Sequence, residues 1–414
     1  MEQKKRVPKR RFKGFVDEWE ERILEDLGRF GKTYSYSRAK EGVGDYYHIH
    51  YGDIHKRYDG VIKKTTKIPS LKVEGNYETL NNGDIVLADA SEDYMDLGKT
   101  VVIEEANKRK IIAGLHTFKF TPNEYLNSLF YLYYSQSSLF KKFSYKTGTG
   151  ISVFGISKEN INKMKLKIPS YLEQQKIGDF FKKLDDMITI QQRKLEKTKA
   201  LKSAYLAEMF PAEGERVPKR RFAGFTDEWE ERKLENVTDV RDGTHDSPKF
   251  YSEGHPFITS KNIRDGFITY EDIKYIAEND FEKINRRSKV DKDDILMGMI
   301  GTIGNIALVR TPPKFAIKNV ALIKDAKYIY HLYLYYYLQS PNVMNQLMDG
   351  IDGGTQKFIA LNKIRNLKIA FPNMEEQYKI GELMENLEYI IINHQRKLEK
   401  LQALKQAYLH EMFV

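Results

Sequence analysis

The sequence predicts an α+β fold: two pseudo-symmetric globular modules of mixed α/β structure, separated by two long antiparallel helices that form a coiled coil. Three observations predict it. A leading segment occurs twice, as residues 6–25 and 216–235, with 17 of 20 positions identical. A helical segment also occurs twice, as residues 191–210 and 394–413, with 15 of 20 identical. The stretches that these blocks enclose differ extensively, so we expect two equivalent modules with different targets.

The module boundaries follow from where the repeated blocks end. Both modules are rich in short β-forming runs interrupted by Gly, Asn and Asp, and each holds one aromatic stretch, 125–138 or 328–341, that predicts a core helix. Residues 83–86 correspond to 293–296, which indicates a shared fold. The predicted order is a leading segment (1–22), a first module (23–168), a central long helix (169–215), a second leading segment (216–232), a second module (233–371) and a C-terminal long helix (372–414).

The two long helices are predicted from their hydrophobic spacing. Apolar residues recur in alternating steps of four and three, as in a coiled-coil seam, and each helix should begin just after Pro169 or Pro372 with glutamate in its first turn. The seam positions are Ile177, Phe181, Leu184, Ile188, Gln191 and Leu195, then Ile380, Met384, Leu387, Ile391, His394 and Leu398. The polar residues Gln191 and His394 occupy equivalent positions, and we expect them to meet as one polar layer that fixes the register.

The order of the segments also predicts where the chain ends lie. Leading segment, module and helix follow one another twice in the same order. A pseudo-two-fold arrangement then requires the second helix to end where the first leading segment begins. We therefore expect Val414 to lie close to the segment around Arg6.

Composition narrows the class of protein. The 68 Lys and Arg exceed the 58 Asp and Glu, giving a net charge of +10. This excess fits a polyanionic partner such as nucleic acid, although a moderately basic protein of another class would also show it. There is no cysteine, which excludes disulfides and thiolate sites. The sequence has no secretory signal and no apolar run near the ~18 residues of a membrane span, so we expect a cytoplasmic protein without membrane contact.

Catalytic motifs are not found. Leu97 to Thr100 resembles the end of a phosphate-binding loop, but Asp93 stands where its leading glycine should be. The Asn-Pro-Pro-aromatic motif of adenine methyltransferases and the glycine-rich dinucleotide motif are also missing. No nucleophile, base and acid occur as a recognisable set. We expect no catalytic residue in this chain.

Three histidines could suggest a metal site. His48, His50 and His55 lie close in sequence, and residues i and i+2 of a strand share a face. No cysteine accompanies them, and the second module has Ile258 and Ser260 at the equivalent places. We therefore expect no metal and interpret them as polar side chains on an exposed strand.

Polar and aromatic loops beside basic residues are the strongest candidates for a binding site. The loops 31–38 and 243–249 occupy equivalent places, each followed by a polar strand, and a Gly/Thr segment recurs as 146–150 and 352–356. These residue types read base edges and bind phosphates, although an ordinary turn with an edge strand would look the same. The candidates are Lys32, Thr33, Tyr34, Ser35, Tyr36, Arg38, His48, His50, Thr149, Thr244, His245, Ser247, Lys249, Ser260, Lys261, Asn262, Thr355 and Gln356.

The frame resembles the specificity (S) subunits of type I restriction–modification systems. Each module begins after Phe-x-x-Glu-Trp-Glu-x-x-x-Leu (Phe15 to Leu24; Phe225 to Leu234) and ends at Pro-x-x-x-Glu-Gln-x-Lys-Ile (Pro169 to Ile177; Pro372 to Ile380). The Gly-Thr-His-x-x-Pro-Lys loop of the second module also looks like that of a known target-recognition domain. The first module lacks this loop motif.

The resemblance implies a division of labour. Each module would be a target-recognition domain that reads half of a split site in double-stranded DNA, and the paired helices would set the spacing. Two methyltransferase (M) subunits would bind S-adenosylmethionine and methylate adenine. Restriction/translocase (R) subunits would use ATP and Mg²⁺ to cleave DNA. This chain would bind no cofactor of its own.

Two other functions are alternatives to DNA recognition. A fused methyltransferase–nuclease would need catalytic motifs that this chain lacks. A coiled-coil scaffold whose two modules bind protein partners is the second alternative. Salt separates it from DNA binding, because DNA affinity falls steeply with salt as counterions are released.

Overall fold

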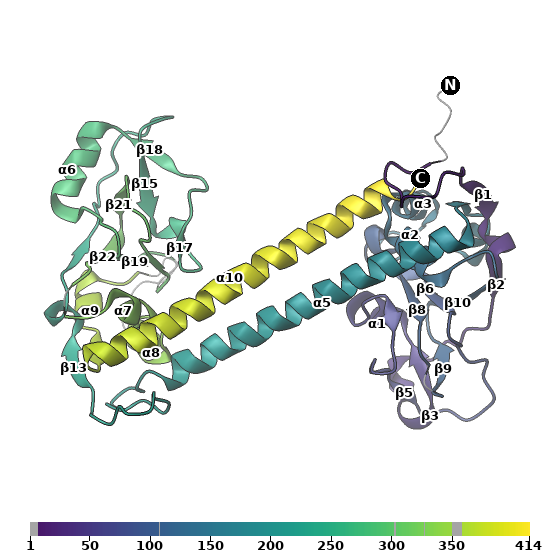
Figure 1. Ribbon diagram of the computed structural model, residues 1–414, viewed down its shortest axis with the longest axis horizontal. Helices are drawn as coiled ribbons and strands as arrows, with labels where there is room; N and C mark the ends of the chain where they lie inside the picture. The colour runs from purple at the N-terminus through teal and green to yellow at the C-terminus, as the bar shows by residue number, and fades with distance from the viewer. Residues whose placement is uncertain (1–6, 107, 302–303, 327, 350–357) are drawn as a thin grey trace. The chain divides into compact units, whose positions relative to one another are not determined.

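The structure is a computed structural model that describes residues 7–106, 108–301, 304–326, 328–349 and 358–414 (Figure 1). The chain forms two compact units, and each combines one module with parts of both long helices. Unit 1 comprises residues 1–192 and 396–414, and unit 2 comprises residues 193–395. In the described ranges, no helix is both long enough and apolar enough for a bilayer crossing.

The module of unit 1 is built on two sheets of buried apolar strands. The five-stranded sheet runs β2 (Gly28–Phe30), β10 (Thr117–Pro122), β6 (Ile85–Ala88), β8 (Thr100–Ile103), β4 (Val61–Ile62). The three-stranded sheet runs β5 (Ser70–Leu71), β3 (Glu41–Ile49), β9 (Lys110–Ala113). The central strand β3 is parallel to β9 and antiparallel to β5. A short pair, β7 (Ala90–Ser91) with β11 (Phe154–Gly155), completes the module.

The module of unit 2 repeats the core of this topology with a four-stranded sheet in place of the five-stranded one. One sheet runs β14 (Val240–Asp242), β22 (Val320–Ile323), β19 (Ile295–Gly298), β20 (Ile306–Leu308). The other runs β18 (Lys274–Ile276), β15 (His255–Thr259), β21 (Ala316–Lys318), with β15 parallel to β21. Unit 2 also has the hairpin β16 (Ile263–Arg264) with β17 (Phe267–Ile268) and the helix α6 (Glu278–Ser288). The shared fold predicted for the modules is confirmed.

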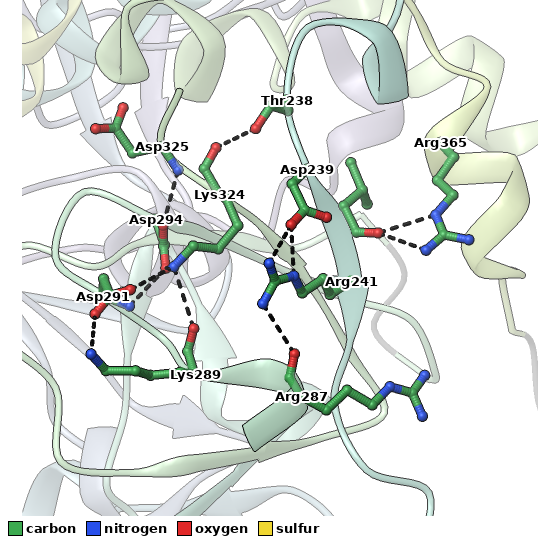
Figure 2. A network of polar contacts seen from close by, with 11 residues as sticks. Thr238, Asp239, Arg241, Arg287, Lys289, Asp291, Asp294, Lys324, Asp325 and Arg365 are labelled. Carbon is green, nitrogen blue, oxygen red and sulfur yellow. Dashed lines mark hydrogen bonds and ion pairs between the residues drawn. The ribbon is translucent and has the colours of Figure 1, made fainter. Parts of the chain in front are cut away.

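The matched segments 83–86 and 293–296 end the same kind of turn and begin the strands β6 and β19. Asp84 and Asp294 are each 1% exposed, and each accepts a backbone N–H at 2.7 Å, from Asn81 and Asp291 respectively. A lysine compensates each buried carboxylate: Lys119 lies 3.3 Å from Asp84, and Lys324 lies 2.6 Å from Asp294 (Figure 2). Buried charges need such partners.

The aromatic stretches form core helices, and a second helix follows each of them closely. The pairs are α2 (Ser128–Gln136) with α3 (Ser138–Thr147), and α7 (His331–Tyr337) with α8 (Pro341–Met348). The single helices predicted for 125–138 and 328–341 are confirmed as α2 and α7, and Ser137 and Ser340 then cap the next helix by accepting from Phe140 N and Val343 N. The core position is confirmed, since residues 130–135 and 332–337 are buried.

The leading segments and the remaining elements close each module. The strands β1 (Glu20–Ile23) and β13 (Glu230–Lys233) pair with the last strand of their module, β12 (Lys165–Ile168) and β23 (Lys368–Phe371). Trp19 and Trp229, which precede these strands, are each 1% exposed. The other helices are α1 (Tyr51–Lys56), α4 (Lys158–Asn162), α9 (Leu361–Arg365) and the 3₁₀ turns Leu24–Leu27, Arg38–Lys40, Tyr94–Asp96, Leu234–Asn236 and Ser260–Asn262.

The two long helices are α5 (Tyr171–Glu208) and α10 (Met374–Glu411), each of 38 residues. They begin two residues after the prolines that predicted their start, and most seam positions are buried, which confirms the seam. The helices run antiparallel within unit 1, where Phe181 stacks on Phe413 at 5.9 Å and, further along α5, Asp185 pairs with Lys405 at 2.6 Å. The equivalent pair in unit 2 is Glu388 with Lys202.

The polar layer of the seam stays a prediction, because Gln191 belongs to unit 1 and His394 to unit 2. Gln191 is only 5% exposed, so it does not lean out into solvent.

Repeated arginines clasp the leading segments to the helices. Arg11 binds Glu173 through two hydrogen bonds of 2.7 Å in unit 1, and Arg221 binds Glu376 through bonds of 2.7 and 2.8 Å in unit 2. Both glutamate side chains are fully buried. Both glutamates lie in the first turn of their helix, as the sequence predicts.

A second contact joins the end of the last helix to the first leading segment, as the order of the segments predicts. Arg10 N donates to the Glu411 carbonyl at 3.0 Å, and the Arg10 side chain pairs with that of Glu411 at 2.6 Å. Arg220 and Glu208 repeat this contact in unit 2. The last helix therefore ends beside the first leading segment. Arg6 itself lies outside the described residues.

Candidate nucleic-acid interface

In the first module, tyrosines anchor the loop that was predicted to bind DNA. Tyr34 and Tyr36 are half-buried against Tyr77: Tyr36 Oη lies 2.8 Å from Tyr77 Oη, and Tyr34 Oη accepts from Glu78 N at 2.7 Å. The hydrogen bond with Tyr36 raises the pKa of Tyr77 to about 12. Lys32, Thr33 and Ser35 are exposed on the anchored loop. The loop therefore offers these three side chains to a partner while the tyrosines hold its shape.

Arg38 has strong partners inside the protein. Its guanidinium donates to Asp53 Oδ1 at 2.9 Å and lies 3.4 Å from Glu41, and these contacts raise its pKa. Asp53 is fully buried and also pairs with Arg57 at 3.2 Å. Arg38 is thus already committed to a buried carboxylate, and its predicted contact with DNA stays a prediction.

The structure corrects the expected placement of His48 and His50. They do not lie on an exposed strand: His48 is 0% exposed and His50 is 7% exposed, because β3 is the central strand of its sheet and ends at Ile49. His50 instead caps α1, its Nδ1 accepting from Gly52 N at 3.1 Å. Among the described residues, no three His, Asp or Glu side chains gather as metal ligands. The role of His48 and His50 in DNA binding stays a prediction.

Burial of these histidines predicts acid sensitivity of unit 1. Desolvation lowers the pKa of His48 and His50 below the ordinary 6.5, despite the nearby carboxylates of Glu41 and Asp53. The unfolded chain therefore binds more protons than the folded one as the pH falls below about 6.5, so unit 1 should lose stability there. Thermal unfolding between pH 7.5 and 5 measures this.

The second module supplies the matched control for this prediction. It has Ile258 and Ser260 at the equivalent positions, so His48→Ile with His50→Ser should flatten the pH dependence of unit 1. An unchanged slope in that variant would contradict the assignment.

In the second module, the predicted loop follows β14 and exposes His245, Ser247 and Lys249. Thr244 is half-buried, and its N–H donates to the Ile317 carbonyl at 3.0 Å. The His245 ring is held on both sides, with Nε2 2.8 Å from Asp242 Oδ2 and Nδ1 2.8 Å from Asn319 Oδ1. Lys318 donates to Ser247. The loop is therefore fixed although its side chains are accessible.

Charged side chains hold the strand that carries this loop. Arg365 donates twice to the Val240 carbonyl, at 3.1 and 2.9 Å, and Arg241 donates to the Arg287 carbonyl at 3.2 Å (Figure 2). Arg287 in turn donates to the largely buried Asp242. Asp242 also lines a pocket of about 240 Å³, together with the apolar residues Ile300, Phe358 and Leu361.

The remaining candidates divide into exposed and structural residues. Lys261 and Thr149 are exposed. Ser260 and Asn262 are buried, which corrects their expected place on a polar strand, because β15 ends at Thr259. Ser260 Oγ donates to the Asn319 carbonyl at 2.8 Å, and Asn262 Oδ1 accepts from Thr259 N at 3.0 Å. Thr355 and Gln356 lie outside the described residues.

Sequence reasoning overlooked polar residues at one corner of each module. Asp89 and His116 form such a pair in the first module, and Asp242 and Asn319 flank His245 in the second. Asp242 directly precedes the Gly-Thr-His loop, so its position was a usable signal. No sequence signal marked His116 or Asn319.

Comparison with known proteins assigns both modules to one family. Residues 16–200 and 226–403 match the family model of the type I restriction modification DNA specificity domain. The type I restriction enzyme MjaVIII specificity subunit of Methanocaldococcus jannaschii is 23% identical over 371 residues, which cover 85% of this chain and 82% of that protein.

Two solved structures share the fold. The S subunit of a type I restriction–modification system from M. genitalium has a TM-score of 0.64 at 14% identity, covering 99% of each chain. A chain from a structural study of complex assembly in the type I R-M system has a TM-score of 0.51 at 17% identity, covering 95% of this chain and 97% of that one. Since the family model matches most of both halves, this chain belongs to the family of type I restriction modification DNA specificity subunits.

Proposed function

We propose that each module reads one half of a bipartite site in double-stranded DNA and that the paired helices set the spacing between the halves. Membership of the specificity family supports a role in DNA sequence recognition. The observation that carries the bipartite reading is that two modules of one topology expose loops of different chemistry after equivalent strands, β2 and β14. The first offers Lys32, Thr33 and Ser35, and the second offers His245, Ser247 and Lys249.

We infer that partner subunits perform the chemistry. Two methyltransferase (M) subunits would bind S-adenosylmethionine, and restriction/translocase (R) subunits would use ATP and Mg²⁺, while this chain binds no cofactor. The missing catalytic motifs support this division. So does the fold shared with a chain from a study of type I complex assembly. Work on cellular DNA would place the chain in the cytoplasm.

Mapping methylated adenines tests the proposal. The full chain would be expressed with its M subunits in a host free of adenine methylation, and the genome would then be mapped. We expect one motif of two half-sites with a fixed spacer. A single continuous motif would contradict the bipartite reading, and no methylation with intact M subunits would contradict the function.

Truncation of exposed loop lysines separates two kinds of contact. Lys32→Ala and Lys249→Ala should each weaken DNA binding. A lysine on phosphate should lower the slope of log affinity against log salt by about 0.9 without changing base preference. A lysine on a base edge should relax preference at one position by about 1–3 kcal/mol. Competition binding across a salt series measures both effects.

Two outcomes check that interpretation. Lys163→Ala removes an exposed lysine that pairs with Glu159 on α4, and it should leave base preference unchanged. Binding that does not respond to salt would instead favour the protein-binding scaffold.

A further inference from the structure

Both modules hold a residue in left-handed backbone conformation at the same corner. His116 directly precedes β10 with φ +53°, and Asn319 directly precedes the equivalent strand β22, also with φ +53°. Glycine adopts this conformation freely, and among the other residues Asn, Asp and His enter it most readily; four further non-glycine residues of the described chain also adopt it. The conformation alone does not mark a site, but both modules place a polar side chain at the same corner, and the contacts of that side chain carry the argument.

In the first module, the corner brings together a histidine, a carboxylate and an aromatic ring. His116 Nδ1 lies 3.2 Å from Asp89 Oδ1, and Asp89 N donates to the His116 carbonyl at 3.1 Å. The Tyr51 ring lies 5.3 Å from the His116 ring. The His116 side chain is 52% exposed and that of Asp89 is 22% exposed. The pair is therefore both fixed and accessible.

The chemistry of this pair suits one class of base edge. An ionised carboxylate only accepts hydrogen bonds, so Asp89 holds the histidine proton on Nδ1 and leaves Nε2 as an acceptor. Burial raises the pKa of Asp89, and the neighbouring His116 opposes that shift. The corner thus presents acceptors, which match the exocyclic amino groups of adenine and cytosine in the major groove.

The second module builds the equivalent corner from other elements. Its carboxylate, Asp242, comes from the end of β14, whereas Asp89 follows β6. Its histidine, His245, comes from the loop and is 63% exposed, while Asn319 occupies the left-handed position. Both corners pair a histidine with a carboxylate, but these residues come from different places in the sequence, so a copied motif does not explain the pairing.

We propose that these two corners, Asp89 with His116 and Asp242 with His245 and Asn319, are the base-reading points of the two modules. The inference rests on the proposed bipartite function and assigns base recognition to particular residues. The first corner reads an amino group of adenine or cytosine. In the second corner both ring nitrogens of His245 are paired, with Asp242 and with the Asn319 amide oxygen, so the Asn319 amide N–H donor reads the base there and favours an acceptor on guanine or thymine.

Glycine substitution at each corner separates an effect on base recognition from an effect on the stability of the fold. His116→Gly and Asn319→Gly relieve the backbone conformation, so both variants should stay folded or gain stability. Each should lose roughly tenfold or more in discrimination at one position of its own half-site, and none in the other half-site. Methylated-adenine maps of the complex with its M subunits, and competition with duplexes substituted at each position, measure this.

A matched glycine variant controls for the substitution itself. Asp293 is also left-handed, with φ +70°, but it lies in the turn before β19, where the first module already has Gly83. Asp293→Gly should therefore preserve both half-sites. Asp89→Asn keeps the shape of the first corner while losing the charge that fixes the proton, and it should change the preferred base at the same position.

The outcomes distinguish a base-reading role of the corner residues from a purely structural one. A folded His116→Gly variant with unchanged preference at every position, or with a uniform loss across all sequences, would overturn the inference. If that variant unfolds, unchanged preference in Asp89→Asn overturns it instead. A wild-type complex that methylates no bipartite motif would refute the proposed function rather than the assignment of the corners.

Discussion

Exchange of residues 23–168 for the module of another specificity subunit is expected to replace one half of the recognised site and to leave the other half and the spacer unchanged. The reason is that the frame holds each module through repeated residues. Gln174 binds Asn127 N and the Tyr125 carbonyl, both at 2.9 Å, and Gln377 repeats this at Tyr330 N. An incoming module that makes these contacts can therefore take the place of the original module as a whole.

The junction sets the conditions for this exchange. A Cβ at Gly178 of α5 would lie 2.6 Å from Leu129 Cβ, so the incoming module must tolerate a close helix contact. The exposed pair of Lys63 with Asp186 would be lost, which costs little. Methylated-adenine mapping is the measurement, and exchange of 233–371 is the reciprocal control. Simultaneous change of both half-sites would show that the modules do not read independently.

Replacement of Arg11 by methionine is expected to destabilise unit 1 by about 3–5 kcal/mol, because it leaves the buried carboxylate of Glu173 without its charged partner. Arg221→Met should do the same to unit 2 through Glu376. Replacing both members together, Arg11→Met with Glu173→Leu, should recover most of the loss. Arg10→Ala, which removes an exposed partner of Glu411, should have a much smaller effect.

The two tryptophans allow each unit to be followed separately. The chain has only two, and Trp19 is buried in unit 1 while Trp229 is buried in unit 2. Denaturant unfolding by fluorescence in a Trp229→Phe background therefore reports unit 1, and a Trp19→Phe background reports unit 2. Equal loss in both units from Arg11→Met would contradict a local clasp.

The frame could be predicted from the sequence because a repeat and a seam are local patterns. Ile177 and Phe181 are buried as their spacing predicts. The exposure of a strand depends instead on its neighbours, and β3 buries His48 because it lies between β5 and β9. The corner at His116 depends on a backbone angle, and a histidine in sequence does not reveal a left-handed conformation. The frame was therefore predictable, whereas the polar corners required the coordinates.

The contact between the last helix and the first leading segment has a consequence for biosynthesis. Leu409, Met412 and Phe413 belong to the same hydrophobic core as Trp19 and Phe130, so this core cannot close until these residues have left the ribosome. Unit 2 is a single continuous stretch, 193–395, and needs no later residue. Domains ordinarily fold in the order of their synthesis. Here unit 1, most of which is translated first, completes its core last. Until Leu409, Met412 and Phe413 have been synthesised, part of its apolar core lacks its packing partners.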